Sequence, residues 1–375
     1  MKKSTHKAIV VPIILEKHPN ADTLSLCKVF DGYTCVVKTA DWLNIKRGVF
    51  IPPDSLVDVA KPEFKFLEKE AKYNENSYKG KQFARVTAKK LRGIISYGLL
   101  IPAPGFSNIE DNLAEYYEIK HFEPPINAQE NKLYCMIGGE VAKPPTGFFP
   151  KYDVDSFLRY GKMVFTEGES VSISEKIHGA SGKYVYQNNQ FYCGSRTEFK
   201  KEYAVPPIYN KIELENKLGK EKATDIILKL EEKIANWKPK RNMWWQALHQ
   251  DENLQKFLKD NENVAIYGEV IGCQDFRYNL KPSEIDFYVF DIMKNGKWIN
   301  VQEAREFGKN LKWVPLLYDN FPFKFDELIK LSQRNSVLNN NQIAEGIVVK
   351  PILEREHFTI GRVQLKIINP DYLIR

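Results

Sequence analysis

Cysteine and histidine are scarce in this sequence, and their arrangement excludes several kinds of site. The chain has 5 cysteines and 6 histidines in 375 residues, and it contains no Cys-x-x-Cys pair. A structural zinc site or a disulfide framework is therefore not expected. Isolated thiols suit a reducing compartment. The cysteines are Cys27, Cys35, Cys135, Cys193 and Cys273.

Long apolar runs are also missing. No stretch approaches the ~20 apolar residues of a membrane span. Residues 1–7 are basic, but the apolar run after them is short and is broken at Pro12, unlike a secretory or transit peptide. We expect a soluble, intracellular protein with no membrane partner.

The composition instead favours substantial cores and a basic surface. A length of 375 residues suggests two or three domains, and 43% apolar with 13% aromatic residues can fill their cores. Lysine and arginine outnumber aspartate and glutamate by 55 to 48, and the pI is near 8.8. This balance fits a polyanionic partner such as nucleic acid or a nucleotide, although many proteins that bind neither are equally basic.

Residues 1–102 are expected to form an all-β barrel of the OB kind. Short apolar or alternating segments are separated by turn residues, and Asp31-Gly32 is a strong hairpin signal. About five strands over roughly a hundred residues favour a small Greek-key barrel. Strand character is found at residues 8–11, 13–15, 24–30, 33–37, 49–53, 83–88 and 99–102.

Residues 103–150 are expected to link two domains. Strand and helix periodicity weakens there, and prolines cluster at Pro124-Pro125, Pro144-Pro145 and Pro150. We place the domain boundary in this segment and the second domain at residues 151–375.

The second domain mixes strands and helices without the regular alternation of a parallel β–α–β sheet. We therefore expect an α+β fold with antiparallel sheets. Strands are expected at residues 170–175, 183–187, 191–193, 264–270, 287–292, 346–349 and 363–368. Helical spacing is found at residues 212–237, 243–258, 301–310 and 325–338.

The most informative segment is Glu175-Lys176-Ile177-His178-Gly179, which ends an expected strand. A lysine acts as a nucleophile only when burial or neighbouring cations lower the pKa of its ammonium. An isolated match of this kind is more often a surface lysine before a turn. Other segments of the chain change that balance.

Two of these segments carry a charged side chain in an unusual setting. Arg196, in Gly194-Ser195-Arg196, could grip a phosphate or could be a solvated charge after a hairpin. Glu269 stands inside an apolar strand flanked by glycines. It would need a hydroxyl or a metal-bound water as partner, unless it lies on the wet face of an edge strand.

Three further candidates lie nearer the C-terminus. In the strand at 286–292, alternation places Tyr288 and Phe290 on one face and Val289 and Asp291 on the other. Phe290 could stack on a purine, although core packing is the commoner role. Glu345 is a candidate metal-site acid, and Lys350 and Lys366 are candidate phosphate cations.

In order and spacing, these segments resemble motifs I, Ia, III, IIIa, IV and V of the covalent nucleotidyltransferase superfamily. That superfamily contains ATP-dependent RNA and DNA ligases and mRNA capping enzymes. Lys-Ile-His-Gly at 176–179 is similar to RNA ligases of the ligase-2-like class, whereas DNA ligases and capping enzymes usually have aspartate before the glycine. DNA ligases and capping enzymes also place their OB domain after motif V. A chain with the OB domain in front, as expected here, resembles a small subset of RNA ligases.

The resemblance implies an ATP-dependent RNA ligase that performs three nucleotidyl transfers. Lys176 would attack the α-phosphorus of ATP, AMP would pass to an RNA 5′-phosphate, and an RNA 3′-hydroxyl would then expel AMP. Mg²⁺ or Mn²⁺ would accompany ATP, and the metal with Lys366 would keep Lys176 unprotonated. The implied partner is RNA with 3′-hydroxyl and 5′-phosphate ends in a nicked duplex, bound by a monomer.

The resemblance also assigns roles to the remaining residues. The catalytic group would be Lys176, Lys366 and His178, the last helping pyrophosphate to leave. The nucleotide would be bound by Glu175 on the adenine side, Lys176, Gly179, Arg196 at a phosphate or ribose, Glu269 at the ribose hydroxyls, Phe290 stacked on adenine, and Lys350 and Lys366 at the α-phosphate. Glu345 would organise the water shell of the metal.

Two positions depart from the family pattern. Related ligases usually have two lysines one residue apart in motif V, but Ile368 stands at the second position here. The second cation is missing, or Lys350 or Arg362 replaces it. The polar residue often found two positions after the motif I glycine is Ser181. The alternatives are a DNA ligase, a capping guanylyltransferase, or a non-catalytic RNA-binding protein with a degenerate ligase domain.

The N-terminal domain carries a resemblance of its own. The segment His18-Pro19-Asn20-Ala21-Asp22-Thr23-Leu24 and residues 91–98 are similar to tRNA-binding OB modules attached to some aminoacyl-tRNA synthetases. The same segments could equally be turns that stabilise the barrel.

Overall fold

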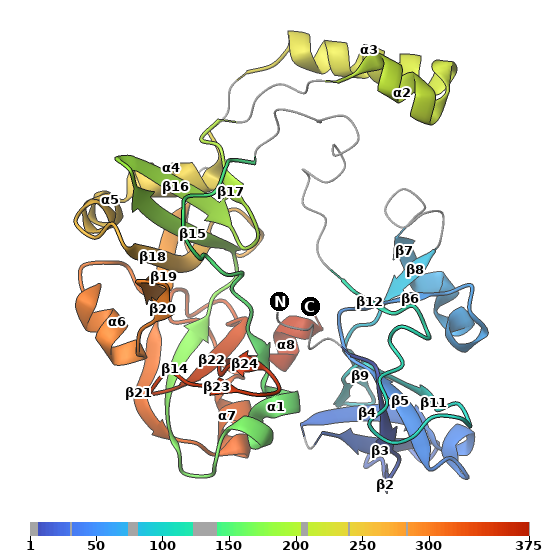
Figure 1. Ribbon diagram of the computed structural model, residues 1–375. Coiled ribbons are helices and arrows are strands. Elements are labelled where there is room, and N and C mark those ends of the chain that lie inside the picture. Colours follow the sequence, from blue (N-terminus) through green and yellow to red (C-terminus); the bar gives the residue numbers. More distant parts are fainter. Residues whose placement is uncertain are drawn as a thin grey trace.

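The computed structural model describes residues 7–30, 32–73, 82–122, 141–203, 209–238, 241–282 and 284–374. Residues 1–6, the turn residue Asp31, the Pro124-Pro125 pair and Cys135 lie outside these ranges. Figure 1 shows an N-terminal domain rich in strands beside a larger domain built from the rest of the chain. None of the helices in the described ranges has the length and apolar character that a membrane crossing requires.

The N-terminal domain consists of short antiparallel sheets. Strands β1 (Ile9–Pro12), β5 (Arg47–Ile51) and β11 (Leu99–Pro102) form one sheet, with β5 in the middle. A second sheet joins β2 (Leu15–Lys17), β3 (Leu24–Val29) and β4 (Tyr33–Lys38). The other strands are β6 (Ser55–Asp58), β7 (Ala71–Tyr73), β8 (Phe83–Arg85) and β12 (Lys120–His121) in one sheet, and β9 (Lys89–Leu91) with β10 (Ile94–Ser96) in a hairpin.

Alternation along the central strands fills two cores in this domain. Val49 and Ile51 belong to one buried cluster, and Phe50, between them, belongs to the other. Successive strand side chains point to opposite faces, so β5 separates the two cores. The 3₁₀ segments η1 (Thr39–Trp42) and η2 (Pro62–Glu70) contribute Trp42 and Phe64 to them.

The described ends of the expected linker pack against the two domains. Tyr117 lies in a core of the N-terminal domain, and the backbone N–H of Leu113 donates to the carbonyl of Ala8 at 2.8 Å. On the other side, the backbone N–H of Ala142 donates to the carbonyl of Phe199 at 2.9 Å. The described parts of residues 103–150 are therefore anchored, and residues 123–140 lie outside the described ranges.

The second domain contains two antiparallel sheets, apart from one parallel strand pair. The first has the order β13 (Asp155–Ser156), β25 (Leu365–Ile368), β22 (Gly346–Pro351), β14 (Ser170–Lys176), β21 (Leu316–Pro322), and β13 and β25 are parallel. The second has the order β17 (Phe199–Lys200), β16 (Gln190–Ser195), β15 (Ala180–Gln187), β18 (Val264–Ile271), β19 (Asp286–Lys294), β20 (Lys297–Trp298). A turn at residues 177–179 carries the chain from β14 into β15. A small hairpin joins β23 (Glu356–His357) and β24 (Gly361–Arg362).

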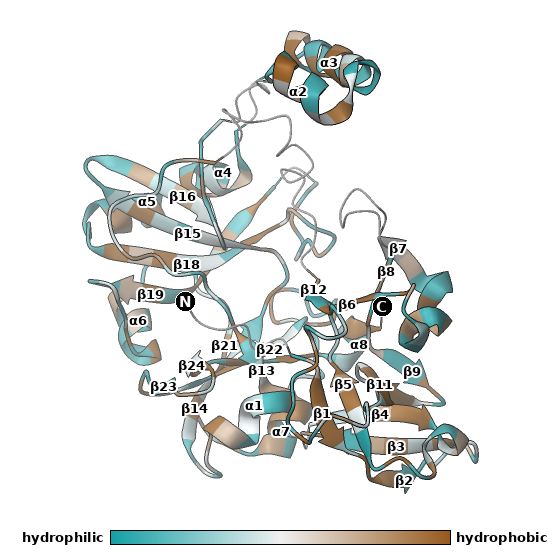
Figure 2. Cartoon of the chain, turned by 45° about the vertical axis from the view of Figure 1, so that its right-hand side comes forward, coloured by the Kyte–Doolittle hydropathy of each residue, from teal (hydrophilic) through white to brown (hydrophobic). Residues whose placement is uncertain are grey.

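Helices cover one face of each sheet. Helices α1 (Phe157–Val164) and α7 (Phe325–Leu331) share a core with β14, β22 and β25. Helices α4 (Met243–Gln250), α5 (Glu252–Lys259) and α6 (Val301–Phe307) share a core with β15, β18 and β19. Helices α2 (Lys211–Leu218) and α3 (Lys220–Ala235) project from the sheets with a small core of their own, and Figure 2 shows bands of both colours along them. The last helix is α8 (Pro370–Leu373).

The helices differ from their predicted extents for local reasons. The segment expected as one helix at 212–237 breaks at Gly219, which has a φ of +80°. The segment at 243–258 breaks at Asp251, whose side chain accepts a hydrogen bond from the Leu254 N–H and caps α5. Helix α7 ends at Leu331, well before residue 338. Helix α1 and strand β21 were not predicted.

The two domains meet at β13. The hydroxyl groups of Tyr33 and Ser156 share a hydrogen bond of 2.8 Å, and the Arg159 guanidinium lies 5.0 Å from the centre of the Phe30 ring. A Cβ on Gly32 would lie 2.2 Å from the carbonyl oxygen of Leu158, so only glycine permits this approach. The N-terminal domain therefore adjoins the edge of the five-stranded sheet, one strand from Lys366.

Candidate active site

Strand alternation places three lysines on one face of the five-stranded sheet. The core side of this sheet is lined by alternate residues of β14, β22 and β25, which are Val171, Ile173, Ile347, Val349, Leu365 and Ile367. The intervening residues face the other way, away from α1 and α7. Lys176, Lys350 and Lys366 are among them, so motifs far apart in the sequence converge on one surface.

The register of the strands fixes how these lysines are spaced. Lys176 lies opposite Gly346, and Gly346 lies opposite Ile368 on the next strand. Lys366 lies opposite Val348. A Cβ on Gly346 would stand 2.0 Å from the carbonyl oxygen of Ile367, so glycine is required for β22 and β25 to come together beside Lys176.

Two carboxylates surround Lys176. Its Nζ donates to Oε1 of Glu345 at 2.6 Å, and both side chains are largely buried. Burial acts to lower the pKa of Lys176, but Glu345 and Glu269 together outweigh it and raise that pKa above its ordinary value. Glu345, the larger of these two influences, therefore stabilises the ammonium form of Lys176. The expectation that Lys366 and a metal keep Lys176 unprotonated stays a prediction.

Glu269 is the second of these carboxylates, and it comes from the other sheet. It lies on β18 opposite Ser181, close to the backbone of Gly179. Burial raises the pKa of Glu269 to about 8. The neighbouring Glu345 also raises this pKa, whereas Lys176 acts to lower it. A Cβ on Gly179 would lie 2.3 Å from the carbonyl oxygen of Val270, so the motif I turn closes directly onto β18.

Lys366 differs from Lys176 in having carboxylates nearby, Glu345, Asp54 and Asp155, but none of them in direct contact with its ammonium. Among the residues that the structure describes, no hydrogen bond or ion pair holds its ammonium. Burial and the nearby Lys176 lower the pKa of Lys366. It is therefore a cation available to an anionic ligand on the same face as Lys176.

His178 is held from both sides. Nε2 lies 2.9 Å from Oδ1 of Asp275, and Nδ1 lies 2.7 Å from the hydroxyl of Tyr372 on α8. The carboxylate can only accept when ionised, so we assign the proton to Nε2 and let the Tyr372 hydroxyl donate to Nδ1. No local pattern in the sequence points to Asp275 or Tyr372, because both are brought to His178 by the tertiary fold.

Glu175 points away from this face. Its carboxylate is buried, and it accepts hydrogen bonds from the Ser336 hydroxyl and, at 2.7 Å, from the Val337 N–H. Burial raises the pKa of Glu175, and these donors oppose the rise. The side chain thus anchors residues 336–337 beneath the site, and its predicted contact with the adenine side stays a prediction.

Lys350 faces the site but is engaged by Asp291. Its Nζ lies 2.8 Å from Oδ2 of Asp291, which also accepts from the Tyr152 hydroxyl at 2.9 Å and lies 2.6 Å from Nη1 of Arg362. Arg362 is paired in addition with Glu354. Lys350 and Arg362, the two cations considered as replacements for a second motif V lysine, are thus both held by carboxylates.

The prediction that Asp291 shares a face of its strand with Val289 is wrong, and a β-bulge explains why. Tyr267 lies opposite Asp291, but the adjacent Gly268 lies opposite Val289, so one residue of β19 is left over. After the bulge the alternation is reversed, and Asp291 no longer shares the face of Val289. The bulge brings Asp291 to the side from which Lys350 and Arg362 approach.

The other predicted nucleotide-binding residues lie at the margin of the lysine face. The Phe290 ring packs on Tyr152, with ring centres 4.4 Å apart, and remains partly buried. Nη1 of Arg196 lies 3.1 Å from Oδ1 of Asp153. The structure therefore joins Lys176, His178, Gly179, Glu269, Glu345 and Lys366 closely, and it places Phe290 and Arg196 nearer the segment at residues 149–153.

The acids of this site suit a metal bound through water. In the described ranges, no three side chains of His, Cys, Asp or Glu gather as a ready-made cation site. Glu345 and Glu269 do offer carboxylate oxygens beside Lys176. Hard cations such as Mg²⁺ often keep several waters and use one or two carboxylates together with substrate phosphates, which fits this pair.

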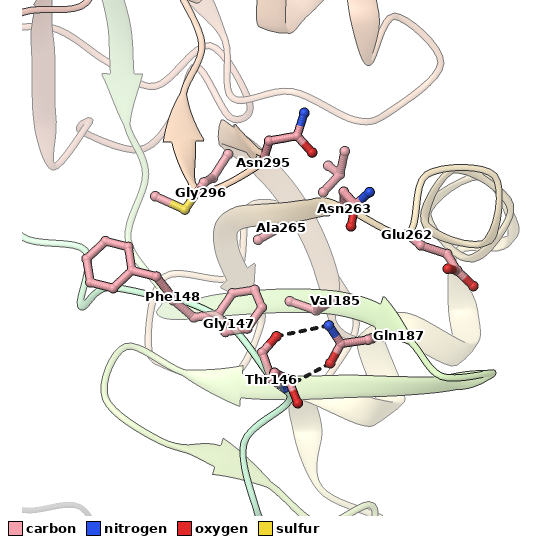
Figure 3. A pocket seen from close by; sticks show the side chains of 13 residues that line it. Thr146, Gly147, Phe148, Val185, Gln187, Glu262, Asn263, Ala265, Asn295 and Gly296 are labelled. Atoms are coloured by element: carbon pink, nitrogen blue, oxygen red, sulfur yellow. Dashed lines mark hydrogen bonds between the residues drawn. The ribbon is translucent and has the colours of Figure 1, made fainter.

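A separate pocket lies at the far end of the six-stranded sheet. Figure 3 shows the side-chain amide of Gln187 hydrogen-bonded to the backbone N–H and carbonyl of Thr146, with Asn263 and Asn295 nearby. The cavity has a volume of about 170 Å³, and none of the predicted site residues lines it.

The two N-terminal segments that resemble tRNA-binding modules contact each other. Nε2 of His18 lies 3.3 Å from the carbonyl oxygen of Leu91, and the Asn20 amide donates to the carbonyl oxygen of Arg92 at 3.1 Å. His18 is fully buried. These contacts give both segments a structural role, and a role in RNA binding stays a prediction.

Comparisons with known proteins agree with this architecture. A family model described as RNA ligase matches residues 169–368, and one described as the PHA02142 OB-fold domain matches residues 9–103. A search of the curated proteins gave no match.

Solved structures of Naegleria gruberi RNA ligase share the fold. A ligand-free lysine-to-alanine mutant is 21% identical with a TM-score of 0.73, over 99% of this chain and 98% of that one. The same ligase with PPi is 22% identical with a TM-score of 0.71, over 99% and 98%. A mutant with ATP and Mn is 21% identical with a TM-score of 0.69, over 98% of both chains.

These matches confirm the predicted fold, an α+β nucleotidyltransferase domain preceded by an OB-fold domain. The RNA ligase model covers more than half of the chain, in the region that holds every predicted site residue. The protein therefore belongs to the RNA ligase family.

Proposed function

We propose that this protein is an ATP-dependent RNA ligase that joins an RNA 3′-hydroxyl to a 5′-phosphate through Lys176–AMP and RNA-adenylate intermediates. The observation that carries the proposal is the arrangement of Lys176, with Glu345 at 2.6 Å and with Lys366 and Glu269 on the surrounding strands. A buried amine beside two carboxylates and a second cation suits covalent attack on a phosphorus atom.

The first step requires Lys176 to lose its proton. While Glu345 holds the ammonium, the pKa of Lys176 is raised. Glu345 and Glu269 would hold a divalent metal through water, and the bound metal neutralises charge on the phosphate oxygens. Once Glu345 turns from Lys176, burial and repulsion by Lys366 act together to favour the neutral amine.

The bonds formed and broken follow from that amine. Nζ of Lys176 bonds to the α-phosphorus of ATP, and the bond from that phosphorus to pyrophosphate breaks. An oxygen of the RNA 5′-phosphate then takes the adenylyl group, which releases Lys176. In the last step the RNA 3′-hydroxyl oxygen bonds to the 5′-phosphorus, AMP leaves, and the proton of the hydroxyl is lost. His178, fixed by Asp275 and Tyr372, would orient the leaving pyrophosphate.

Substrate and cofactor have separate support. Mutants of Naegleria gruberi RNA ligase were solved with ATP and Mn and with AMP and Mn, which supports ATP with Mg²⁺ or Mn²⁺ here. An OB domain beside the β13 edge could hold the RNA that flanks the break, through backbone contacts and base stacking. We propose a nicked duplex as substrate, a monomer as the active form, and an intracellular location.

The test is transfer of AMP to the protein. Wild type incubated with α-labelled ATP and Mg²⁺ should become labelled and gain the mass of one AMP, and Lys176→Ala should do neither. Lys297→Ala, on the short strand β20, is the control and should label normally. A labelled Lys176→Ala protein would refute the assignment of the nucleophile. Sealing of nicks with RNA or DNA 3′-hydroxyl strands, and a comparison with labelled GTP, would distinguish an RNA ligase from a DNA ligase or a capping enzyme.

A further inference from the structure

A second buried lysine lies in the six-stranded sheet, outside the site described above. Lys183 is in β15, between Gly194 on β16 and Tyr267 on β18. Its neighbour Tyr184 belongs to the core under α4 and α5, whereas Val185 belongs to the cluster that contains Tyr267. Alternation therefore turns Lys183 away from the helices, toward the face on which Tyr267 lies.

The ammonium of Lys183 is buried without a direct ionic partner among the described residues. Lys183 is only 3% exposed, yet within the described ranges no hydrogen bond or ion pair holds its ammonium. The Phe199 ring lies beside it, with its centre 4.6 Å from Nζ. Burial lowers the pKa of Lys183 to about 8, and Glu198 opposes this only in part. A buried charge without a counter-ion is costly, so the arrangement favours a missing anion.

Lys200 provides a contrast on the same sheet. It is 1% exposed and lies on β17, but its Nζ is 3.1 Å from Oε2 of Glu198. Its ammonium also lies 6.0 Å from the centre of the Trp244 ring, on the side of α4. The sheet thus buries one lysine with a carboxylate and one without.

Arg196 directly follows β16, the strand that pairs with β15 beside Lys183. Gly194, two residues before Arg196, is the register partner of Lys183. The segment at residues 149–153 borders both, because Phe149 packs on Phe199 and Asp153 receives the Arg196 guanidinium. Tyr267, the other register partner of Lys183, donates its hydroxyl proton to the carbonyl of Pro150.

We propose that Lys183, together with Arg196, forms a second phosphate-binding position of this enzyme, separate from the Lys176–Lys366 pair. The inference rests on the proposed ligase function, which supplies two sources of phosphate: the triphosphate of ATP and the terminal phosphate of the RNA. Binding either group gives the Lys183 ammonium the counter-ion that the protein withholds.

The experiment compares Lys183→Met with Lys200→Met, because methionine preserves most of the side-chain volume in both. The first arm measures binding of inorganic pyrophosphate by calorimetry and adenylylation with ATP in the absence of RNA. The second arm measures binding of nicked RNA carrying a 5′-phosphate or a 5′-hydroxyl, and AMP transfer from preformed enzyme–AMP. A lost charge-assisted contact predicts a fall of roughly 10-fold or more in one arm for Lys183→Met.

The arm that is affected identifies the source of the phosphate. Loss confined to 5′-phosphate RNA assigns the position to the RNA end, and loss of pyrophosphate binding assigns it to the nucleotide. Equal binding of both probes by Lys183→Met and wild type overturns the proposal. If Lys183→Met does not fold, Lys183→Gln is judged by the same comparison. A wild type that never becomes adenylylated refutes the ligase function itself, and the two binding measurements then still decide whether Lys183 meets a phosphate.

Discussion

The Asp291 cluster gives a test of what Lys350 does. Asp291 is 2% exposed and is contacted by Lys350, Arg362 and the Tyr152 hydroxyl. Burial acts to raise the pKa of Asp291, but Arg362 and Lys350 hold it below its ordinary value. The carboxylate therefore stays ionised and is shared by two buried cations. Lys350 is either a structural partner of Asp291 or a ligand for the nucleotide.

Removing Asp291 and removing Lys350 leave different buried charges behind. Asp291→Asn leaves Lys350 and Arg362 close together without their shared carboxylate. Breaking a buried ion pair in this way costs about 3–5 kcal/mol of folding free energy. Lys350→Met leaves Asp291 still bound by Arg362 and Tyr152, and the methionine replaces most of the lysine stem. The variant gives up two hydrogen bonds of Lys350, to Asp291 and to the carbonyl oxygen of Phe290, so we expect it to lose about 2 kcal/mol.

The assay is urea unfolding followed by tryptophan fluorescence, combined with the adenylylation measurement. Trp298 is a local reporter, since the Arg362 guanidinium lies 4.1 Å from the centre of its ring. A structural Lys350 predicts a larger loss of stability for Asp291→Asn than for Lys350→Met, and near-normal adenylylation by Lys350→Met. If Lys350→Met keeps its stability but loses adenylylation, the reasoning is refuted and Lys350 is a nucleotide ligand.

Three further predictions concern other parts of the site. The pKa of Glu269 is raised from 4.5 to about 8, so the folded protein keeps a proton that the unfolded chain has lost, and stability should fall as the pH rises through this window. Glu269→Gln should remove a slope of at most about 1.4 kcal/mol per pH unit, measured by urea unfolding at several pH values, and an unchanged slope would contradict the assignment. Tyr372→Phe removes the donor to Nδ1 of His178 and should slow adenylylation by about 5- to 10-fold, consistent with the loss of one hydrogen bond, while the melting temperature falls by only a few degrees. An unaltered rate would show that Tyr372 does not position His178. Gly346→Ala should lose about 1–3 kcal/mol by forcing apart β22 and β25, more than Gly168→Ala, whose Cβ meets nothing within 4 Å, and equal losses in thermal unfolding would exclude this contact as the cause.

Most strands and helices, and the order of the motifs, could be predicted from local patterns in the sequence. The strand that ends in Lys176 was predicted to within one residue, because alternation and a following turn are encoded locally. Helix α1 was missed, although its buried residues Phe157, Tyr160, Gly161 and Val164 have helical spacing. Its short length and internal glycine weakened that signal.

Contacts between distant segments were not readable in the same way. The partner of Lys350 depended on one extra residue in β19, and a β-bulge reverses every later side chain without a mark in the sequence. Asp275 and Tyr372 reach His178 from 97 and 194 residues away, and no local pattern encodes such a meeting.

The sequence by itself determined which residue types could do the chemistry, since a lysine, two glutamates and further cations stand in a recognisable order. The tertiary structure decided which of those charges remain available. Lys350 and Arg362 share a buried carboxylate, whereas within the described residues no hydrogen bond or ion pair holds Lys366 or Lys183. The physical reason is that charge compensation acts through space over a few ångströms, and only the packing of the two sheets sets those distances.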